Sequence, residues 1–188
     1  MKRFFFVLLS IIKFKSHFKI LLNKKHNVLN ISYLNAYNLK NIGIKYIIFD
    51  FDGVLAPLNK NDLPDSIYMC FLKFSIDFSE ERIFILSNNP KKERLEYFKK
   101  NFPKIKFLFG FPKKPYPHGI LHVQRLFSCS TKEIALVDDR LLTGCLACFL
   151  SKSFPIWVKK PCRDYNSNYI KESFFDYLRT LERFFLRK

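Results

Sequence analysis

The segment that most constrains the fold of this chain is IIFDFDGVLAP, residues 47–57, in which an apolar run ends in Asp50 and Asp52. Such a short apolar run is typical of a strand that is buried on both faces. Burying an unpaired carboxylate costs several kcal/mol, and a second negative charge close by raises that cost. A bound divalent cation would offset both costs. The segment therefore predicts a buried strand whose end carries a cation site.

Short apolar segments and helix-like segments alternate along the chain from Gly43 onward. Strands are predicted at residues 45–49, 82–86, 105–109, 134–137 and 155–158. Helices are predicted between them at residues 63–74, 91–100, 119–127 and 141–150, and a last amphipathic helix is predicted at 169–186. This alternation is typical of a parallel sheet with crossover helices. The expected fold class is α/β, with a Rossmann-like parallel sheet that carries helices on both faces.

Polar side chains follow four of the five predicted strands. They are Asp50 and Asp52 after the first strand, Ser87 and Asn88 after the second, Lys113 and Lys114 after the third, and Asp138 and Asp139 after the fourth. In an open parallel sheet, ligands bind at the carboxyl ends of the strands. The fold is therefore expected to gather carboxylates, a hydroxyl, an amide and an ammonium at one edge. These groups are suited to Mg²⁺-dependent phosphoryl transfer.

Each group has a physical role in such a reaction. Mg²⁺ prefers hard oxygen ligands, which the carboxylates of Asp50 and Asp139 supply. A free carboxylate can attack phosphorus and form an aspartyl-phosphate. A carboxyl group two residues further on can protonate the leaving alkoxide and then activate water. Ser87 and Lys114, with Asn88 beside them, are expected to bind the phosphoryl oxygens as charge spreads over these atoms.

The motif DFDGV, residues 50–54, resembles the first motif of the haloacid-dehalogenase superfamily of phosphatases, which reads D-x-D-G-[TV]. The resemblance implies that Asp50 is the nucleophile and a Mg²⁺ ligand. It also implies that Asp52 is the general acid and base, with its backbone carbonyl on the metal. The later motifs of the superfamily fall, in order, on Ser87, on Lys114 and on Asp139, with Asp138 as a further candidate Mg²⁺ ligand.

Longer segments resemble one family within that superfamily. GIKYIIFDFDGVLAP, ILSNNP, KKP and DDRLLTG are similar to motifs of the bacterial and mitochondrial phosphatidylglycerophosphate phosphatases, over residues 42–158. The resemblance implies removal of the terminal phosphate from phosphatidylglycerophosphate, which leaves phosphatidylglycerol for cardiolipin synthesis. Only short gaps separate the motifs, so no cap domain is expected. An uncapped site suits a large substrate or one embedded in a surface.

The chain departs from the pattern of that family at four positions. Gly53 stands where the family usually has Asn. The fourth motif of the family reads G-D-Q-[LI]-x-T-D. Here Asp138 and Arg140 replace its Gly and Gln, and Gly144 replaces its last Asp. Asp138 is expected to substitute for the acid that is lost at position 144.

The chain is strongly basic, with 33 Lys and Arg residues against 16 Asp and Glu residues and a net charge of +17. Such a charge favours polyanionic partners. Residues 1–25 interleave Lys and Arg with apolar residues, as a helix lying in a membrane interface does. We expect a basic amphipathic segment over 1–40, bound to an anionic phospholipid surface, and a phosphatase domain over 41–188. A helix that packs on its own domain is the alternative.

The apolar run at residues 4–12 is shorter than the ~20 residues that a membrane crossing needs, so no transmembrane span is expected. Five cysteines without the spacing of a disulfide framework indicate a reducing compartment. The expected location is peripheral, on the cytoplasmic or organelle-interior face of a membrane. Nucleic acid is not expected as a partner, because no nucleic-acid module accompanies the phosphatase motifs.

Three other functions stay open at this point. One is a soluble, uncapped phosphatase of the same superfamily that acts on a sugar phosphate or a nucleotide. A second is a phosphatase for polynucleotide ends, which would also explain the basic charge. The third is a membrane-binding protein on an inactive scaffold, against which the intact pair Asp50 and Asp52 and the intact Lys114 argue.

Overall fold

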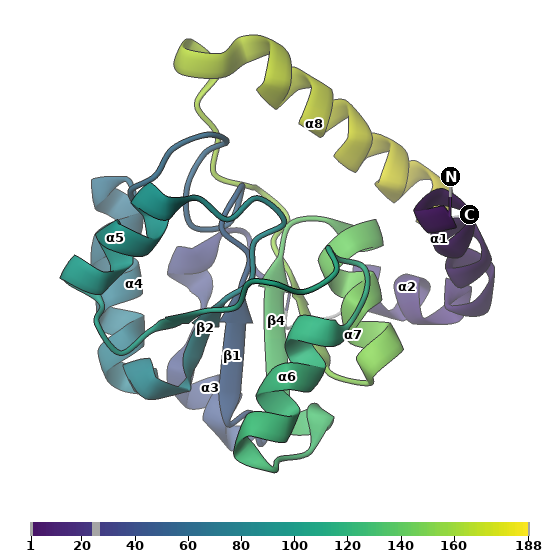
Figure 1. The fold of residues 1–188 in the computed structure, drawn as a ribbon. Coiled ribbons are helices and arrows are strands. Elements are labelled where there is room, and N and C mark those ends of the chain that lie inside the picture. The colour runs from purple at the N-terminus through teal and green to yellow at the C-terminus, as the bar shows by residue number, and fades with distance from the viewer. Residues whose placement is uncertain (1, 24–26, 188) are drawn as a thin grey trace.

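The central sheet of the protein has five parallel strands in the order β3-β2-β1-β4-β5. The computed structural model in Figure 1 describes residues 2–23 and 27–187. The strands are β1 (Tyr46–Phe49), β2 (Ile83–Ile85), β3 (Lys106–Phe107), β4 (Ile134–Asp138) and β5 (Phe154–Trp157). All five predicted strands are present, so the predicted α/β class with a parallel sheet is confirmed.

Helices cover both faces of this sheet because successive strand residues point to opposite faces and both sets are apolar. Phe49 and Val137 pack on one face against α3 (Ala36–Asn41), α4 (Asp65–Phe78) and α5 (Lys92–Asn101). On the other face, Ile48 and Leu136 pack against α6 (His118–Phe127) and α7 (Leu146–Ser151). Short helical turns complete these connections: η1 (Ile31–Tyr33), η2 (Glu80–Arg82), η3 (Thr131–Glu133) and the π-helical η4 (Leu141–Cys145).

The register of β1 determines which residues meet at the carboxyl edge of the sheet. Phe49 lies between Ile85 and Val137, its partners on the two flanking strands. The backbone N–H of Asp50 donates to the carbonyl of Val137 at 2.9 Å, so the ladder ends where the acidic residues begin. The residues that follow β1, β2 and β4 therefore emerge at the same edge.

The long C-terminal helix α8 (Tyr165–Arg187), kinked at Asn168, crosses above that edge in Figure 1. Its apolar residues recur at helical spacing, as expected, but the face that they form is not the buried one. Ile170 and Phe174 are exposed, whereas Glu172, Arg179 and Glu182 are buried. The helix is thus oriented by its charged side chains.

Two N-terminal helices, α1 (Lys2–Lys13) and α2 (Lys15–Leu22), lie beside the C-terminal end of α8 in Figure 1. Phe18 and Leu21 of α2 are buried in a cluster with Trp157 and Leu186. The following segment joins the sheet, because Val28 bridges to Val158 beyond the end of β5. These contacts show α2 packing on the domain, which was the alternative to a helix held only by lipid.

The predicted division at residue 40 stays a prediction. Of the basic residues in the N-terminal pattern, Lys24 and Lys25 lie outside the described residues. Among the described residues, none of the helices combines the length and the apolar composition that a membrane crossing requires.

The buried position of Phe18 leads to a stability prediction. Phe18→Ala should lower the free energy of unfolding by ~3–5 kcal/mol, because it opens a cavity in the cluster with Trp157 and Leu186. Ile20→Ala on the same helix is the matched control, since Ile20 is 60% exposed, and should change stability by no more than ~0.5 kcal/mol. Urea denaturation measures both. Equal, small effects would mean that α2 does not belong to the folded domain.

Candidate active site

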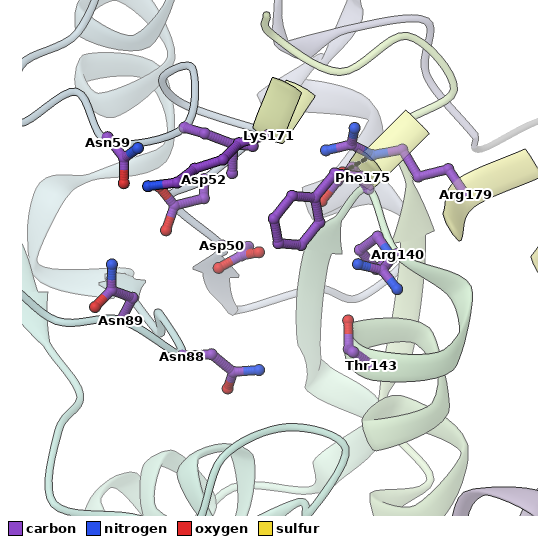
Figure 2. A pocket seen from close by; sticks show the side chains of 12 residues that line it. Asp50, Asp52, Asn59, Asn88, Asn89, Arg140, Thr143, Lys171, Phe175 and Arg179 are labelled. Atoms are coloured by element: carbon purple, nitrogen blue, oxygen red, sulfur yellow. Dashed lines mark hydrogen bonds and ion pairs between the residues drawn. The ribbon is translucent and has the colours of Figure 1, made fainter. Parts of the chain in front are cut away.

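Asp50 lies at the end of β1, at the base of a pocket on the carboxyl edge of the sheet, as Figure 2 shows. One of its carboxylate oxygens, Oδ1, accepts from the backbone N–H of Phe51 at 2.9 Å and lies 2.9 Å from the Lys114 ammonium. Burial raises the pKa of Asp50 to about 8, and the opposing attraction of Lys114 does not cancel this effect. Asp138 and Asp139 raise it further by repulsion.

Lys114 is buried in the loop after β3 and bridges two acids. Its ammonium lies 2.9 Å from Asp50 and 2.5 Å from Oδ2 of Asp138. Burial alone would lower the pKa of Lys114, but the two carboxylates raise it above its usual value, so the group stays charged. Asn88 fixes this loop, because its side-chain oxygen accepts from the Lys114 backbone N–H at 2.7 Å. Ser87, also buried, accepts from the backbone N–H of Asn89 at 3.0 Å.

The carboxylates of Asp50, Asp138 and Asp139 form one cluster, in which one oxygen of each lies within 4.8 Å of the others. Burial raises the pKa of Asp139 to about 6, against the attraction of Arg179. Oδ1 of Asp139 is buried and has no hydrogen-bond partner among the described residues. A cluster of hard oxygen donors from three residues, one of which has an unsatisfied buried acceptor, fits a divalent cation.

Asp138 differs from its neighbour because both of its oxygens are already engaged. Oδ2 accepts from Lys114, and Oδ1 accepts from the backbone N–H of Arg140 at 2.8 Å. Asp138 therefore holds the Lys114 ammonium in place, while Asp139 has one oxygen that remains available to bind a cation.

Two of the departures from the family pattern have a steric reason. A Cβ atom at Gly144 would lie 2.1 Å from Oδ2 of Asp138, so the Asp138 carboxylate occupies the space of a side chain at position 144. Gly53 has a φ of +82°, and a Cβ there would lie 2.8 Å from Oδ2 of Asp139 and 2.9 Å from Arg179. Both glycines thus make room for the carboxylate cluster.

Asp52 lines the pocket and is held by a residue that the sequence reasoning missed. Arg94 of α5 donates to both carboxylate oxygens of Asp52, at 2.6 and 3.0 Å. Its side chain is fully buried, with the guanidinium 4.0 Å from the centre of the Phe51 ring. The available signal was an Arg four residues before Phe98 on the apolar face of a predicted helix, where a buried Arg needs an acidic partner.

The helix α8 supplies a second set of residues that the sequence reasoning missed. Lys171, Phe175 and Arg179 line the pocket, and Figure 2 shows them opposite Asn88 and Asn89. Nε of Arg179 donates to Oδ2 of Asp139 at 2.5 Å. Glu182 accepts from Nε of Arg140 at 2.8 Å and from the Leu141 backbone N–H at 2.9 Å. The signal for this face was the recurrence of the charged residues Glu172, Arg179 and Glu182 at helical spacing.

The structure brings most of the predicted site residues together. Asp50, Lys114, Asp138 and Asp139 form a single network, and Asn88 attaches to it through Lys114. Ser87 is buried at the end of β2, on the same edge of the sheet. Asp52 is turned toward Arg94, with which it pairs at 2.6 Å. Lys113, the neighbour of Lys114, is exposed.

Comparison with solved structures reproduces the fold. One solved structure superposes with a TM-score of 0.52 at 13% identity, over 76% of this chain and 84% of the other. A predicted phosphoglycolate phosphatase from Haemophilus somnus 129PT gives a TM-score of 0.44 at 14% identity, over 66% of this chain and 88% of that one. The cobalt-bound deoxy-D-mannose-octulosonate 8-phosphate phosphatase from Haemophilus influenzae gives 0.42 at 14% identity, over 73% and 90%.

No curated protein matches the chain. The family described as mitochondrial PGP phosphatase matches residues 11–163, which include every motif of the pocket except the α8 side chains. The predicted family is therefore confirmed. The chain belongs to the mitochondrial PGP phosphatase family and is a phosphatase.

Proposed function

We propose that this phosphatase hydrolyses phosphatidylglycerophosphate to phosphatidylglycerol through an aspartyl-phosphate on Asp50. The observation that carries the proposal is the position of the Asp50 carboxylate, which lies at the pocket and 2.9 Å from the buried Lys114 ammonium. A carboxylate next to a fixed positive charge can attack a phosphoryl group whose oxygens that charge neutralises. The family supports a lipid phosphomonoester as the substrate.

The proposed reaction has two steps, and each is assigned to a side chain of the pocket. In the first, an Asp50 oxygen bonds to phosphorus, the bond to the glycerol oxygen breaks, and Asp52 gives its proton to the leaving alkoxide. In the second, Asp52 takes a proton from water, which attacks phosphorus and releases Asp50. Arg94 fixes the plane of the Asp52 carboxyl group through both oxygens. Each of these oxygens retains a second lone pair for the proton.

Asp50, Asp139 and the backbone carbonyl of Asp52 would hold the Mg²⁺ ion of the proposed reaction. The unsatisfied Oδ1 of Asp139 supports this choice. The bound cation would supply positive charge to the phosphoryl oxygens and to the crowded carboxylates. Asp138, which also belongs to the acidic cluster, is assigned to Lys114 instead, because both of its oxygens are engaged.

An anionic phospholipid membrane is the proposed partner, since a lipid phosphate stays in its bilayer and the enzyme must reach it there. The net charge of +17 favours such a surface, and each suitably placed Lys or Arg contributes about 1 kcal/mol of attraction. The proposed location is peripheral, on the cytoplasmic or organelle-interior face.

The nucleophile is tested by Asp50→Asn. The amide cannot form the acyl-phosphate, so phosphate release from phosphatidylglycerophosphate should fall by about a thousandfold or more. Because the change also removes a negative charge from the buried cluster, the unfolding temperature should be no lower than that of the wild type. Asp77→Asn, at an exposed position of α4, is the control and should retain full activity.

A substrate panel run with the same proteins separates the candidate functions. It compares phosphatidylglycerophosphate with a sugar phosphate, a nucleotide and a 5′-phosphorylated oligonucleotide. Faster release from any of the soluble compounds would reject the lipid assignment. Full activity of the Asp50→Asn variant would reject the assignment of Asp50 as the nucleophile.

The assignment of the two neighbouring acids is tested by Mg²⁺ dependence. Asp139→Asn should raise the Mg²⁺ concentration for half-maximal activity by about tenfold or more. The activity of this variant should recover in excess Mg²⁺. Asp138→Asn should remain impaired at every Mg²⁺ concentration, because it weakens the hold on Lys114. Isothermal titration with Mg²⁺ gives the affinities directly. The reverse pattern would exchange the two roles.

The steric relation between Asp138 and Gly144 predicts a rescue. Gly144→Asp alone should be damaging, because its Cβ would lie 2.1 Å from the Asp138 carboxylate. Asp138→Gly alone should also be damaging, because Lys114 loses a partner. The double variant, which restores the usual family arrangement, should exceed either single variant by about tenfold in kcat/KM, as expected for neighbours coupled by ~1–3 kcal/mol. If the relative kcat/KM of the double variant equalled the product of the relative values of the two single variants, positions 138 and 144 would be independent. That result would contradict the idea that Asp138 replaces an acid at position 144.

A further inference from the structure

One side of α8 is an exposed apolar stripe, defined here as Ile170, Phe174, Tyr177 and Phe185. These four side chains are 82%, 56%, 61% and 63% exposed, respectively. Their spacing along the chain places them on one side of the helix. Soluble proteins seldom expose a continuous apolar surface of this kind unless it contacts a partner.

The opposite side of α8 explains why the stripe cannot turn inward. Arg179 is paired with Asp139, and Glu182 is paired with Arg140. Near the other end, Glu172 is buried and accepts from the Leu58 backbone N–H at 3.1 Å. These three charged contacts span the helix and fix its rotation about its own axis. Rotating the stripe toward the core would leave buried charges on the sheet edge without partners.

We propose that the apolar stripe of α8 docks on the surface of an anionic phospholipid bilayer. This inference rests on the proposed function and deepens it by naming the helix that meets the lipid. Aromatic and aliphatic side chains of this kind insert at the level of the lipid head groups. The α8 helix also carries the exposed residues Lys171 and Arg187, which an anionic surface attracts.

Charge argues for lipid over a second copy of the chain as the occupant. Two copies that met through their stripes would each bring a net charge of +17 and the same basic residues on α8. Their repulsion opposes association, whereas the same charges favour an anionic bilayer. The helix α1, which lies near the C-terminal end of α8 in Figure 1, also carries the exposed apolar residues Leu8, Leu9 and Ile12.

Docking through α8 has a direct effect on the active site, because the same helix forms one wall of the pocket. Lys171 and Phe175 line the pocket, and Phe174 of the stripe is in ring contact with Phe175 at 5.7 Å between centroids. A bilayer held against the stripe would therefore lie one helix diameter from the pocket. That distance is ~10–12 Å, the width of an α-helix with its side chains.

The test uses the full chain with Ile170, Phe174 and Phe185 all changed to Ser. A matched control changes three equally exposed apolar residues of α3 and α4, Tyr37, Met69 and Ile76, to Ser. Sedimentation with vesicles of equimolar phosphatidylglycerol and phosphatidylcholine measures binding. The stripe variant should bind about tenfold or more weakly than the wild type, and the control should bind like the wild type. Pure phosphatidylcholine vesicles should bind the wild type more weakly than the anionic vesicles do.

Two further measurements keep the outcome interpretable. Hydrolysis of p-nitrophenyl phosphate and the unfolding temperature should be unchanged in the stripe variant, since its residues are exposed. If the triple variant does not fold, Ile170→Ser alone replaces it, with Ile76→Ser as its control. Analytical ultracentrifugation compares the oligomeric state of the wild type and of the stripe variant.

The proposal would be overturned if the stripe variant bound anionic vesicles as tightly as the wild type does. A wild-type dimer that the stripe substitutions dissociate would also overturn it, since the stripe would then be an interface between copies. Equal binding to neutral and anionic vesicles would overturn the choice of an anionic surface. If the wild type binds through the stripe and hydrolyses p-nitrophenyl phosphate but not phosphatidylglycerophosphate in those vesicles, docking is supported and the proposed substrate is rejected.

Discussion

The buried ion pairs of Lys114 are the interaction on which the pocket depends. One ammonium lies 2.9 Å from Asp50 and 2.5 Å from Asp138, in a region where neither acid has enough water to stabilise its charge alone. Replacing Lys114 with a neutral residue would leave the two buried carboxylates without the positive charge between them, which is strongly destabilising. The sheet brings these residues together through register, since β1 and β4 end side by side. The crowding of negative charge is thus retained for chemistry and not for stability.

The helix α8 completes the pocket by adding side chains from the C-terminal end of the chain. It lies beyond the residues matched by the family, yet it supplies Arg179 to the acidic cluster and Phe175 to the pocket wall. An uncapped phosphatase site would otherwise be open above the sheet edge. The charged side of the helix closes part of that opening. The cost of burying Arg179 and Glu182 is offset because Arg179 pairs with Asp139 and Glu182 pairs with Arg140.

The sequence was sufficient to predict the parts of the structure that depend on local pattern. Alternating apolar segments predicted the five strands, and the rule that ligands bind at strand ends placed Asp50, Lys114 and Asp139 at one edge. Contacts between distant segments could not be predicted in this way. Arg94 meets Asp52 across 42 positions of the chain, and the inward side of α8 is set by pairing with loop residues and not by its apolar periodicity. A pattern of apolar residues alone favours the opposite rotation of that helix.

The pairing of Arg179 with Asp139 makes the carboxylate cluster and the outer helix parts of one equilibrium. Any ligand that takes Asp139 away from Arg179 removes one of the contacts that hold α8 in place. Thermodynamic reciprocity then requires that whatever strengthens the attachment of α8 to the domain weakens that ligand by the same factor. Ligand binding in the pocket and attachment of the C-terminal helix to the domain are therefore thermodynamically coupled, so a change in one alters the other.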